Sequence, residues 1–430
     1  MPRKEYVWGN GALPRIAPHS LAKHRILSEY TGQYIRVMTR NPARERLRLA
    51  IVDGFAGGGE YEDELHPGRI VPGSPQILID AIREAEVLVN VGRQKALRID
   101  ATFHVVEKHP QTVTYLREVL GRRPNWRQEQ ERVFVHPGAF EDHVDAIVAD
   151  IRRQGTVHRA LFILDQYGYT AVPVGLIERI FRVLPHAEIF LTLAVGWITA
   201  YLPTIRDAAI KLGLPAETLD RIERDGDEAL NIDDEKRRPD LLAVQRLLQA
   251  IFTKQVRALY YTPFFIVSRE SHRAYWFQHL ANSPKANDVV KELHWAVQNH
   301  FEHFGGAGLA MLGYDPRRDA ELIEQLPLFR FDEAALERAR QALLVGLPER
   351  IYTAFPRGVS FAELVSSVCN ETPATSAHLA EIVNLLCAAG ELTKRGAKGE
   401  RRAPETLPLP DDRIGPPRQR TLFPIGTWRR

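Results

Sequence analysis

The chain has 430 residues, 44% of them hydrophobic, which is enough to bury a large core in two or three domains. Its formal net charge is only +3, so charge alone does not establish a nucleic-acid partner. The two cysteines, Cys369 and Cys387, argue against a disulfide framework and favour a reducing compartment. No stretch approaches the ~20 apolar residues of a membrane span, and we expect a cytoplasmic protein.

The first two-thirds of the chain alternates between predicted strands and predicted helices. Residues 1–18 form a polar arm, and an amphipathic helix is predicted over 20–38. The predicted strands are 46–53, 101–107, 133–136, 160–165 and 187–195, with helices predicted at 76–87, 109–120, 139–154 and 173–184. Near-continuous apolar strands between amphipathic helices are typical of a parallel sheet covered on both faces.

Residues 197–257 break this alternation because they are charged and helical, and we interpret them as an inserted helical subdomain. Two further strands, 258–268 and 274–282, and a helix over 287–304 are expected to complete the first domain, which spans about residues 19–310. A Gly- and Pro-rich linker over 311–331 follows it.

Residues 332–395 are predicted to form a separate winged helix-turn-helix domain. Helical segments are followed by a short strand and a basic turn, and the last helix ends at Gly390, a residue typical of helix C-caps. Residues 396–430 are basic, Pro-rich and without periodicity, so we expect them to be disordered.

The strongest chemical signal is the glycine-rich turn Asp53-Gly-Phe-Ala-Gly-Gly-Gly59, directly after a predicted strand. Glycines there let the backbone approach a ligand closely, and Glu107 at the end of the next strand can accept hydrogen bonds from ribose hydroxyls. The alternative is a tight turn beside a surface glutamate. The residues that we expect to bind a nucleoside cofactor here are Asp53, Gly54, Phe55, Gly57, Gly59 and Glu107.

A second signal lies at the end of the fourth predicted strand, in Asp165-Gln166-Tyr167. Enzymes that methylate amino groups of bases place an acid or amide at this corner to accept hydrogen bonds from the amine, followed by an aromatic ring that stacks on the extruded base. Asp165 and Tyr167 have the side chains for these roles, and Gln166 stands where proline is common. The alternative is a strand end with an ordinary turn.

In combination, these motifs resemble the three-Cys-motif partner protein family. The resemblance covers about residues 19–395 and rests on Lys23–Leu27, Val52–Tyr61, Pro72–Pro75, Val106-Glu107, Asp165–Gly168 and the winged-helix pattern. The same order of motifs is similar to that of the J-type 23S ribosomal RNA adenine-N6 methyltransferases.

The resemblance implies that S-adenosylmethionine binds at Asp53–Gly59 and Glu107, and that a base amine lies at Asp165 and Tyr167. It also implies that Lys23 and His24 border the cofactor or the substrate. It further implies a separate partner protein with a three-cysteine motif.

We therefore expect a class I S-adenosylmethionine methyltransferase-like Rossmann domain, with a helical insertion, followed by a winged helix. The expected function is metal-free methylation of a base amine in RNA or DNA. The alternative is a non-catalytic scaffold that binds nucleic acid or the partner protein through its winged helix. It is favoured by Gln166 and by Gly138-Ala139-Phe140, which lacks the acid common after the third strand and leaves Phe140 to stack on the cofactor. A nicotinamide dehydrogenase would share the glycine turn but does not require the Asp165 corner.

Overall fold

The structure of the protein is a computed structural model. It describes residues 6–154, 157–166, 172–194, 202, 206–207, 209–210, 216–225, 248, 251–268, 273–297, 301–304, 308–309, 328–403 and 405–417. The chain divides into two compact units, which are described one at a time. The first comprises residues 1–234 and 250–289, and the second comprises residues 235–249 and 290–430.

The first unit is built on a mostly parallel sheet. Its strands are β2 (Arg46–Asp53), β5 (Arg98–Glu107), β6 (Val133–Pro137), β7 (Ala160–Leu164), β8 (Ala187–Ala194), β9 (Tyr260–Ser268) and β10 (Arg273–Ala281). Their order across the sheet is β9-β10-β8-β7-β2-β5-β6. Strand β10 runs antiparallel to both β8 and β9, whereas β6, β5, β2, β7 and β8 pair in parallel. This order, with one antiparallel strand near the far edge, is that of a class I methyltransferase-like Rossmann sheet, and the predicted fold class is confirmed.

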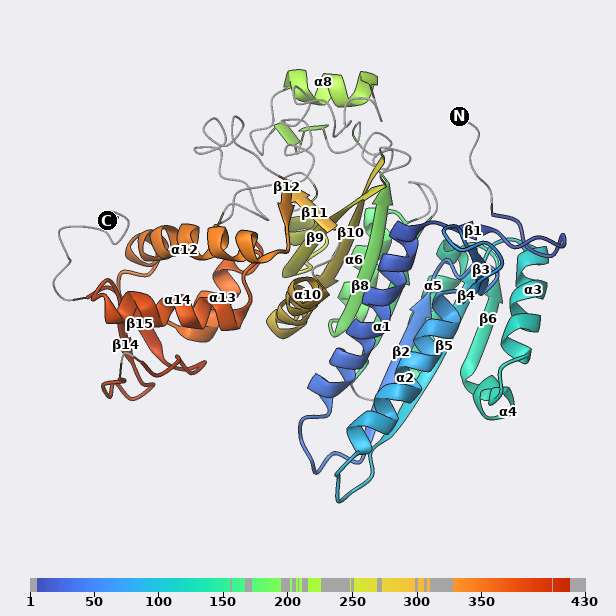
Figure 1. Ribbon diagram of the computed structural model, residues 1–430, viewed down its shortest axis with the longest axis horizontal. Coiled ribbons are helices and arrows are strands. Elements are labelled where there is room, and N and C mark those ends of the chain that lie inside the picture. Colours follow the sequence, from blue (N-terminus) through green and yellow to red (C-terminus); the bar gives the residue numbers. More distant parts are fainter. Residues whose placement is uncertain are drawn as a thin grey trace. The chain divides into compact units, whose positions relative to one another are not determined.

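Helices cover both faces of this sheet, as its apolar strands require. In Figure 1, α1 and α2 lie in front of the sheet and α5 and α6 lie behind it. The helices are α1 (Pro18–Met38), α2 (Ser74–Asn90), α3 (Pro110–Gly121), α4 (Trp126–Glu129), α5 (Phe140–Arg153), α6 (Val174–Val183) and α8 (Ala216–Asp225), with short helical turns η1 (Gln130–Arg132) and η4 (Ile251–Gln255).

Local sequence explains both kinds of element. Residues 49–53 of β2 are buried without interruption, as expected for a strand covered on both faces. Helix α5 instead buries one stripe, formed by Phe140, Val144, Ile147, Val148 and Ile151, which recurs at helical spacing. The two periods are those that distinguish strands from helices in the sequence.

A small second sheet lies beside the carboxyl end of β2. It has the order β1-β3-β4, formed by β1 (Arg15–Ile16), β3 (Glu60–Asp63) and β4 (Ile70–Pro72). We expected a loop between the glycine turn and α2, and the hairpin β3–β4 is a difference from that expectation. Because β1 pairs with β3, the N-terminal arm is fixed against this hairpin.

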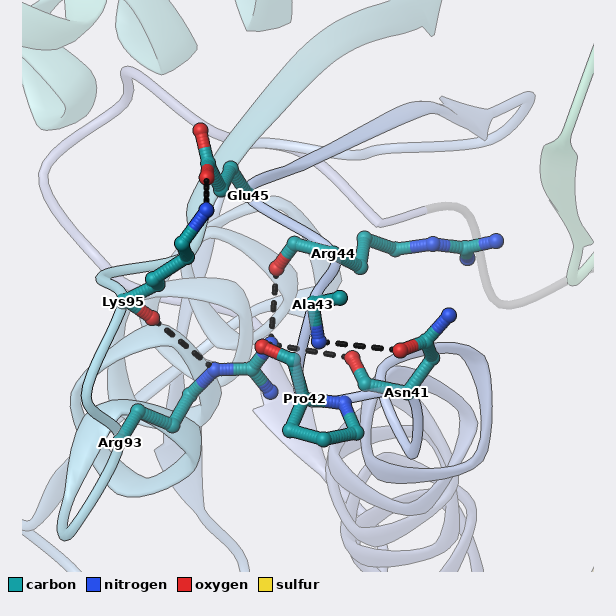
Figure 2. Close-up of polar contacts among 7 residues, drawn as sticks. All are labelled: Asn41, Pro42, Ala43, Arg44, Glu45, Arg93 and Lys95. Atoms are coloured by element: carbon teal, nitrogen blue, oxygen red, sulfur yellow. Dashed lines mark hydrogen bonds and ion pairs between the residues drawn. The ribbon is translucent and has the colours of Figure 1, made fainter.

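At the opposite end of β2, one arginine joins two loops. The Arg93 guanidinium donates hydrogen bonds to the carbonyl oxygens of Thr39, Asn41, Pro42 and Arg44, at 3.0, 3.1, 3.0 and 2.7 Å. Figure 2 shows Arg93 inserted beside the loop of residues 41–45, with Lys95 paired to Glu45 next to it. These carbonyl oxygens follow the end of α1, so Arg93 fixes the connection from α1 into β2.

The second unit contains a winged helix. Its elements are β11 (Phe301–Phe304), β12 (Leu328–Arg330), α12 (Glu333–Ala354), β13 (Val359–Ser360), α13 (Phe361–Val368), α14 (Ser376–Ala388), β14 (Thr393–Arg395) and β15 (Arg413–Gly415), and helix α10 (Pro284–Val297) runs across the boundary between the units. Helices α12, α13 and α14 share one apolar core that includes Leu347, Leu364 and Leu386. Capping boxes at Ser360 and Thr375 define where α13 and α14 begin.

Two expectations for the C-terminal part need correction. Residues 413–415 are not disordered, because β15 pairs with both β13 and β14 to complete the wing. Composition hid this strand, which is short and flanked by prolines. The helix predicted over 287–304 ends at Val297, and residues 301–304 form β11 instead. Residues 418–430 and most of the predicted insertion at 197–257 lie outside the described residues.

We expect Arg93→Lys to lower the free energy of unfolding by about 1–3 kcal/mol, because one ammonium group cannot reach the carbonyl oxygens that the planar guanidinium spans. Urea unfolding of parent and variant measures this loss. Arg98→Lys is the matched control, since Arg98 makes an exposed ion pair with Asp100 and such pairs contribute little. Equal losses of stability in the two variants would show that the hydrogen bonds of Arg93 do not stabilise the connection from α1 to β2.

Candidate cofactor and substrate site

At its four glycine positions, the turn after β2 cannot accept a larger residue without strain or a close contact. Gly57 and Gly59 have φ angles of 60° and 83°, in the left-handed region that favours glycine. A Cβ atom on Gly54 would lie 2.8 Å from Leu164 Cδ2, and one on Gly58 would collide with the Trp8 indole. The turn is therefore a backbone surface packed against neighbouring side chains, as a close approach to a ligand requires.

Glu107 at the end of β5 holds this turn in place. Its Oε2 accepts a hydrogen bond from the Gly57 amide at 3.1 Å, and its Oε1 accepts one from the His109 amide at 2.8 Å. Because a carboxylate has about four acceptor positions, Glu107 can still accept further hydrogen bonds from a ligand. The sequence predicted Glu107 as a ribose acceptor, and the structure adds a role in shaping the turn.

Asp53, the last residue of β2, is a buried acid at the start of the turn, with 2% of its surface exposed. Its Oδ1 accepts a hydrogen bond from the Phe55 amide at 3.2 Å, whereas its Oδ2 makes no hydrogen bond of normal geometry among the described residues. Burial raises the pKa of Asp53 to about 7, although the Ser74 hydroxyl and the Phe55 amide act to lower it. A cationic ligand group beside Oδ2 would restore its charge.

Lys23 of α1 and Asp165 after β7 form an ion pair. Lys23 Nζ lies 2.5 Å from both carboxylate oxygens of Asp165. Burial acts to raise the pKa of Asp165, but the Lys23 charge and hydrogen bond outweigh it, so this pKa lies below its ordinary value. The acid is therefore ionised at neutral pH and is an acceptor only.

His24 lies beside this pair with only 8% of its surface exposed. Burial lowers the pKa of His24 to about 4, so its ring is neutral at pH 7. Among the described residues, no hydrogen-bond partner reaches its buried Nδ1 atom. The structure thus brings the adjacent residues Lys23 and His24 of α1 together with Asp165, which lies 142 positions after Lys23 in the sequence.

The side-chain amide of Gln166, the residue after Asp165, makes two hydrogen bonds to the backbone. The side chain donates to the Thr192 carbonyl oxygen at 3.2 Å and accepts from the Val172 amide at 3.1 Å. It therefore joins β8 to the far end of the loop that follows β7. Tyr167, the predicted stacking residue, lies outside the described residues.

Phe140 begins α5 and is 2% exposed. Its ring packs against Gly54, and its centroid lies 6.1 Å from that of Phe55. This position is at the edge of the glycine turn, as expected for a residue beside a cofactor. Because this ring is buried against Gly54, Phe140 also helps to fix the backbone of the turn.

The N-terminal arm contributes side chains that the sequence did not single out. The Trp8 indole is 4% exposed and donates a hydrogen bond to the Glu60 carbonyl oxygen at 2.8 Å. Its centroid lies 5.3 Å from that of Tyr61, and the Tyr61 ring in turn lies 6.3 Å from His24. The polar composition of the arm concealed this contact, and the only available signal was a lone tryptophan before a Gly-Pro-rich stretch.

Two other histidines, His104 and His109, make contacts in and after β5. His104 packs between β5 and β6 with its Nδ1 3.1 Å from His136 Nε2, and burial lowers the pKa of His104 to about 4. His109 precedes α3 and uses its backbone amide to bond Glu107. The described residues contain no group of three His, Cys, Asp or Glu side chains that could hold a metal ion.

Comparison with known families finds one model that matches part of the chain. Residues 313–399 match the family model of the GMT-like wHTH domain, which agrees with the winged helix of the second unit. No curated protein matches the chain. In the described part of the chain, no helix is both long enough and apolar enough to cross a membrane.

Solved structures are similar at low identity. A Legionella pneumophila protein of the DUF519 family model is 10% identical, with 63% of this chain and 91% of that chain covered and a TM-score of 0.35. A Methanococcus maripaludis protein assigned as an S-adenosyl-L-methionine-dependent methyltransferase is 8% identical, with 61% and 92% covered and a TM-score of 0.24. Mycolic acid cyclopropane synthase, solved with S-adenosylhomocysteine, is 9% identical, with 58% and 83% covered and a TM-score of 0.20. The fold assignment rests on the strand order itself.

The buried Asp53 carboxyl should make stability depend on pH in the cofactor-free protein. A raised pKa means that the folded state keeps a proton that the unfolded state releases. The free energy of unfolding should therefore fall as the pH rises from about 4 to about 7, by up to about 1 kcal/mol per pH unit.

Asp53→Asn should remove this fall, because the amide does not titrate. The difference between parent and variant, measured by urea unfolding at several pH values, isolates the contribution of this one group. Asp145→Asn is the control, since Asp145 is an exposed surface carboxylate. A parent–variant difference that does not change with pH would contradict the assignment of a buried, protonated Asp53.

Proposed function

We propose that this protein is an S-adenosylmethionine-dependent methyltransferase that acts on a base amine of a nucleic acid. The observation that carries the proposal is the meeting of two acids, Asp53 and Asp165, at the carboxyl ends of two neighbouring strands of the sheet. Asp53 ends β2, and Asp165 follows β7, the strand next to β2. The strand order reverses direction between these two strands, and ligands of open α/β sheets bind at such switch points.

The residues present fit the cofactor. S-adenosylmethionine supplies a methyl group activated by a positively charged sulfur, and it carries an amino group and a ribose. The unpartnered Oδ2 of Asp53 fits the cationic amino group, and the spare acceptor positions of Glu107 fit ribose hydroxyls. The tight backbone of residues 54–59 lets these groups come close. A nicotinamide cofactor would also use the turn, but it has no need of the Lys23–Asp165 corner.

Asp165 fits the substrate amine. The nitrogen lone pair of a base amine is delocalised into the ring, so acceptors aimed at the amine hydrogens favour a tetrahedral nitrogen that can attack a methyl group. Lys23 keeps Asp165 ionised and fixes its orientation, while the remaining lone pairs of the carboxylate can accept from the amine. Because 28% of the Asp165 side chain is exposed, a substrate can reach it.

The hydrogen bonds of Gln166, and the tyrosine that follows it in the sequence, are consistent with the same proposal. Gln166 fixes both ends of the corner through Thr192 and Val172, so it positions the loop without touching substrate. Tyr167 follows directly and would hold an extruded base by stacking, worth about 1–3 kcal/mol per base. The resemblance to the three-Cys-motif partner protein family adds a partner protein to the proposal.

The second candidate function is a non-catalytic scaffold. It is favoured by the Lys23–Asp165 pair, because both carboxylate oxygens already accept from the lysine ammonium group. In this alternative, the pair is a structural link between α1 and β7.

Asp165→Ala should lower methyl transfer by about 10²–10³-fold, the usual cost of removing one hydrogen-bonding group from a reacting centre. Cofactor binding should stay nearly unchanged because Asp53 and Glu107 are intact. The assay follows a radiolabelled methyl group from S-adenosylmethionine into total cellular RNA and DNA, with and without a three-Cys-motif partner protein.

Asp145→Ala provides the control of a removed surface carboxylate. Parent protein that binds the cofactor yet labels neither nucleic acid, in both conditions, would refute the methyltransferase proposal in favour of the scaffold. Equal activity of Asp165→Ala and parent would remove Asp165 from the mechanism.

A further inference from the structure

The wing of the second unit carries a row of arginines. Arg395 on β14 is the direct cross-strand partner of Arg413 on β15, and on its other side it forms a bridge with Arg401. All three residues are exposed. Directly opposed residues on neighbouring strands point to the same face and are about 5 Å apart, so the three side chains start from one line across the wing.

This arrangement is unfavourable for the isolated protein. Like charges directly opposite each other destabilise a sheet, and here two such pairs share Arg395. Among the described residues, none of the three arginines has an acidic ion-pair partner, and Arg413 donates instead to the Arg357 carbonyl oxygen at 3.2 Å. An anionic ligand would remove the repulsion.

Two cations next to the row in sequence, Lys394 and Arg402, have partners within the domain. Lys394 is 6% exposed and donates to the Asn384 side-chain oxygen at 2.5 Å. Arg402 pairs with the buried Asp412 at 3.1 Å. Charges on the inner face are therefore neutralised within the domain, whereas the charges of the arginine row face outward.

Helix α14, at the position of a recognition helix, has the opposite character. Its exposed residues form one stripe at helical spacing, which consists of Ala377, Glu381, Leu385 and Ala388. The stripe contains no cation, and its one charged residue is acidic. Asn384, the amide that could read a base, instead bonds the Glu405 carbonyl oxygen and Lys394. The stripe lacks the Arg, Lys, Asn and Gln side chains that make bidentate contacts to guanine and adenine.

We propose that the arginine row of the wing binds the sugar-phosphate backbone of a nucleic acid, and that α14 does not read its bases. The row offers planar guanidinium groups, which suit phosphate oxygens, along a line that a backbone can follow. The inference rests on the proposed function, because it states how the same nucleic-acid substrate is held. Contacts to phosphates position a substrate without reading its sequence, so binding by this domain is tolerant of sequence.

The test measures binding of the full chain to mixed-sequence duplex and single-stranded DNA and RNA. Fluorescence anisotropy follows binding between about 50 and 200 mM salt, a range over which phosphate contacts change affinity strongly. The double variant Arg395→Gln, Arg401→Gln should reduce the slope of log affinity against log salt by about 1.4–1.8, because each of the two lost phosphate contacts removes about 0.7–0.9. Its unfolding midpoint should equal or exceed that of the parent, which shows that the variant folds.

Two controls separate charge from position. The double variant Arg127→Gln, Arg338→Gln removes the same charge from exposed positions elsewhere and should keep the parent slope. Leu385→Ala and Glu381→Gln alter the α14 stripe and should change neither affinity nor its tolerance of scrambled sequence. An unchanged slope in the arginine-row variant, or a loss of affinity in the α14 variants, would overturn the inference.

The outcomes distinguish this inference from the proposed function. Parent protein that binds nucleic acid through the wing without methylating it would refute the methyltransferase and leave the arginine row assigned. Methyl transfer that the arginine-row variant retains in full would support the methyltransferase and refute the role of the arginine row in holding its substrate. If the parent binds none of the nucleic-acid probes but binds a three-Cys-motif partner protein through the same arginines, the surface is a protein interface and the inference fails.

Discussion

The candidate site depends on a turn whose glycine positions leave no room for a Cβ atom. Gly54 lies against Leu164 and Phe140, and Gly58 lies against Trp8, so side chains from distant segments all pack on the same short stretch of backbone. Glu107 then bonds the amide of Gly57 and fixes its conformation. Since the turn contributes backbone atoms rather than side chains, a ligand there is recognised by close approach and by the acids around it.

Charge is distributed unevenly around this turn. Asp53, Glu107 and Asp165 lie near enough for the other two acids to act against ionisation of Asp53, while Lys23 is engaged by Asp165. At neutral pH Asp165 is therefore fully ionised, whereas Asp53, with a pKa of about 7, is only about half ionised. Asp165 is held ionised by its lysine, whereas burial outweighs the hydrogen bonds of Ser74 and Phe55 and raises the pKa of Asp53 to about 7. Environments that separate the pKa values of neighbouring acids are typical of functional sites.

The sequence predicted the parts of the site that depend on local order. The apolar run before Asp53, the glycine spacing after it and the acid at Glu107 are all local patterns, and the fold class followed from the alternation of strands and helices. The contact of Lys23 with Asp165 joins residues 142 positions apart, and its geometry cannot be deduced from periodicity.

Other features needed the structure because their signals are weak or misleading. Trp8 lies in a polar arm and Arg93 in an ordinary surface loop, yet each organises several backbone groups. Strand β15 was missed because three residues among prolines give no alternation to detect. The arginine row appears only once β15 is paired with β14, since Arg395, Arg401 and Arg413 are dispersed in the sequence.

The central claim is that the turn after β2 holds a cationic S-adenosylmethionine against the Asp53 carboxylate. The most direct measurement is calorimetric titration of the protein with S-adenosylmethionine, S-adenosylhomocysteine and NAD at pH values below and above 7. We predict binding of both adenosyl ligands and none of NAD, with affinity that rises up to about pH 7 in the parent and loses this dependence in Asp53→Asn. Binding of NAD in place of the adenosyl ligands, or an affinity that neither pH nor Asp53→Asn changes, would contradict the account.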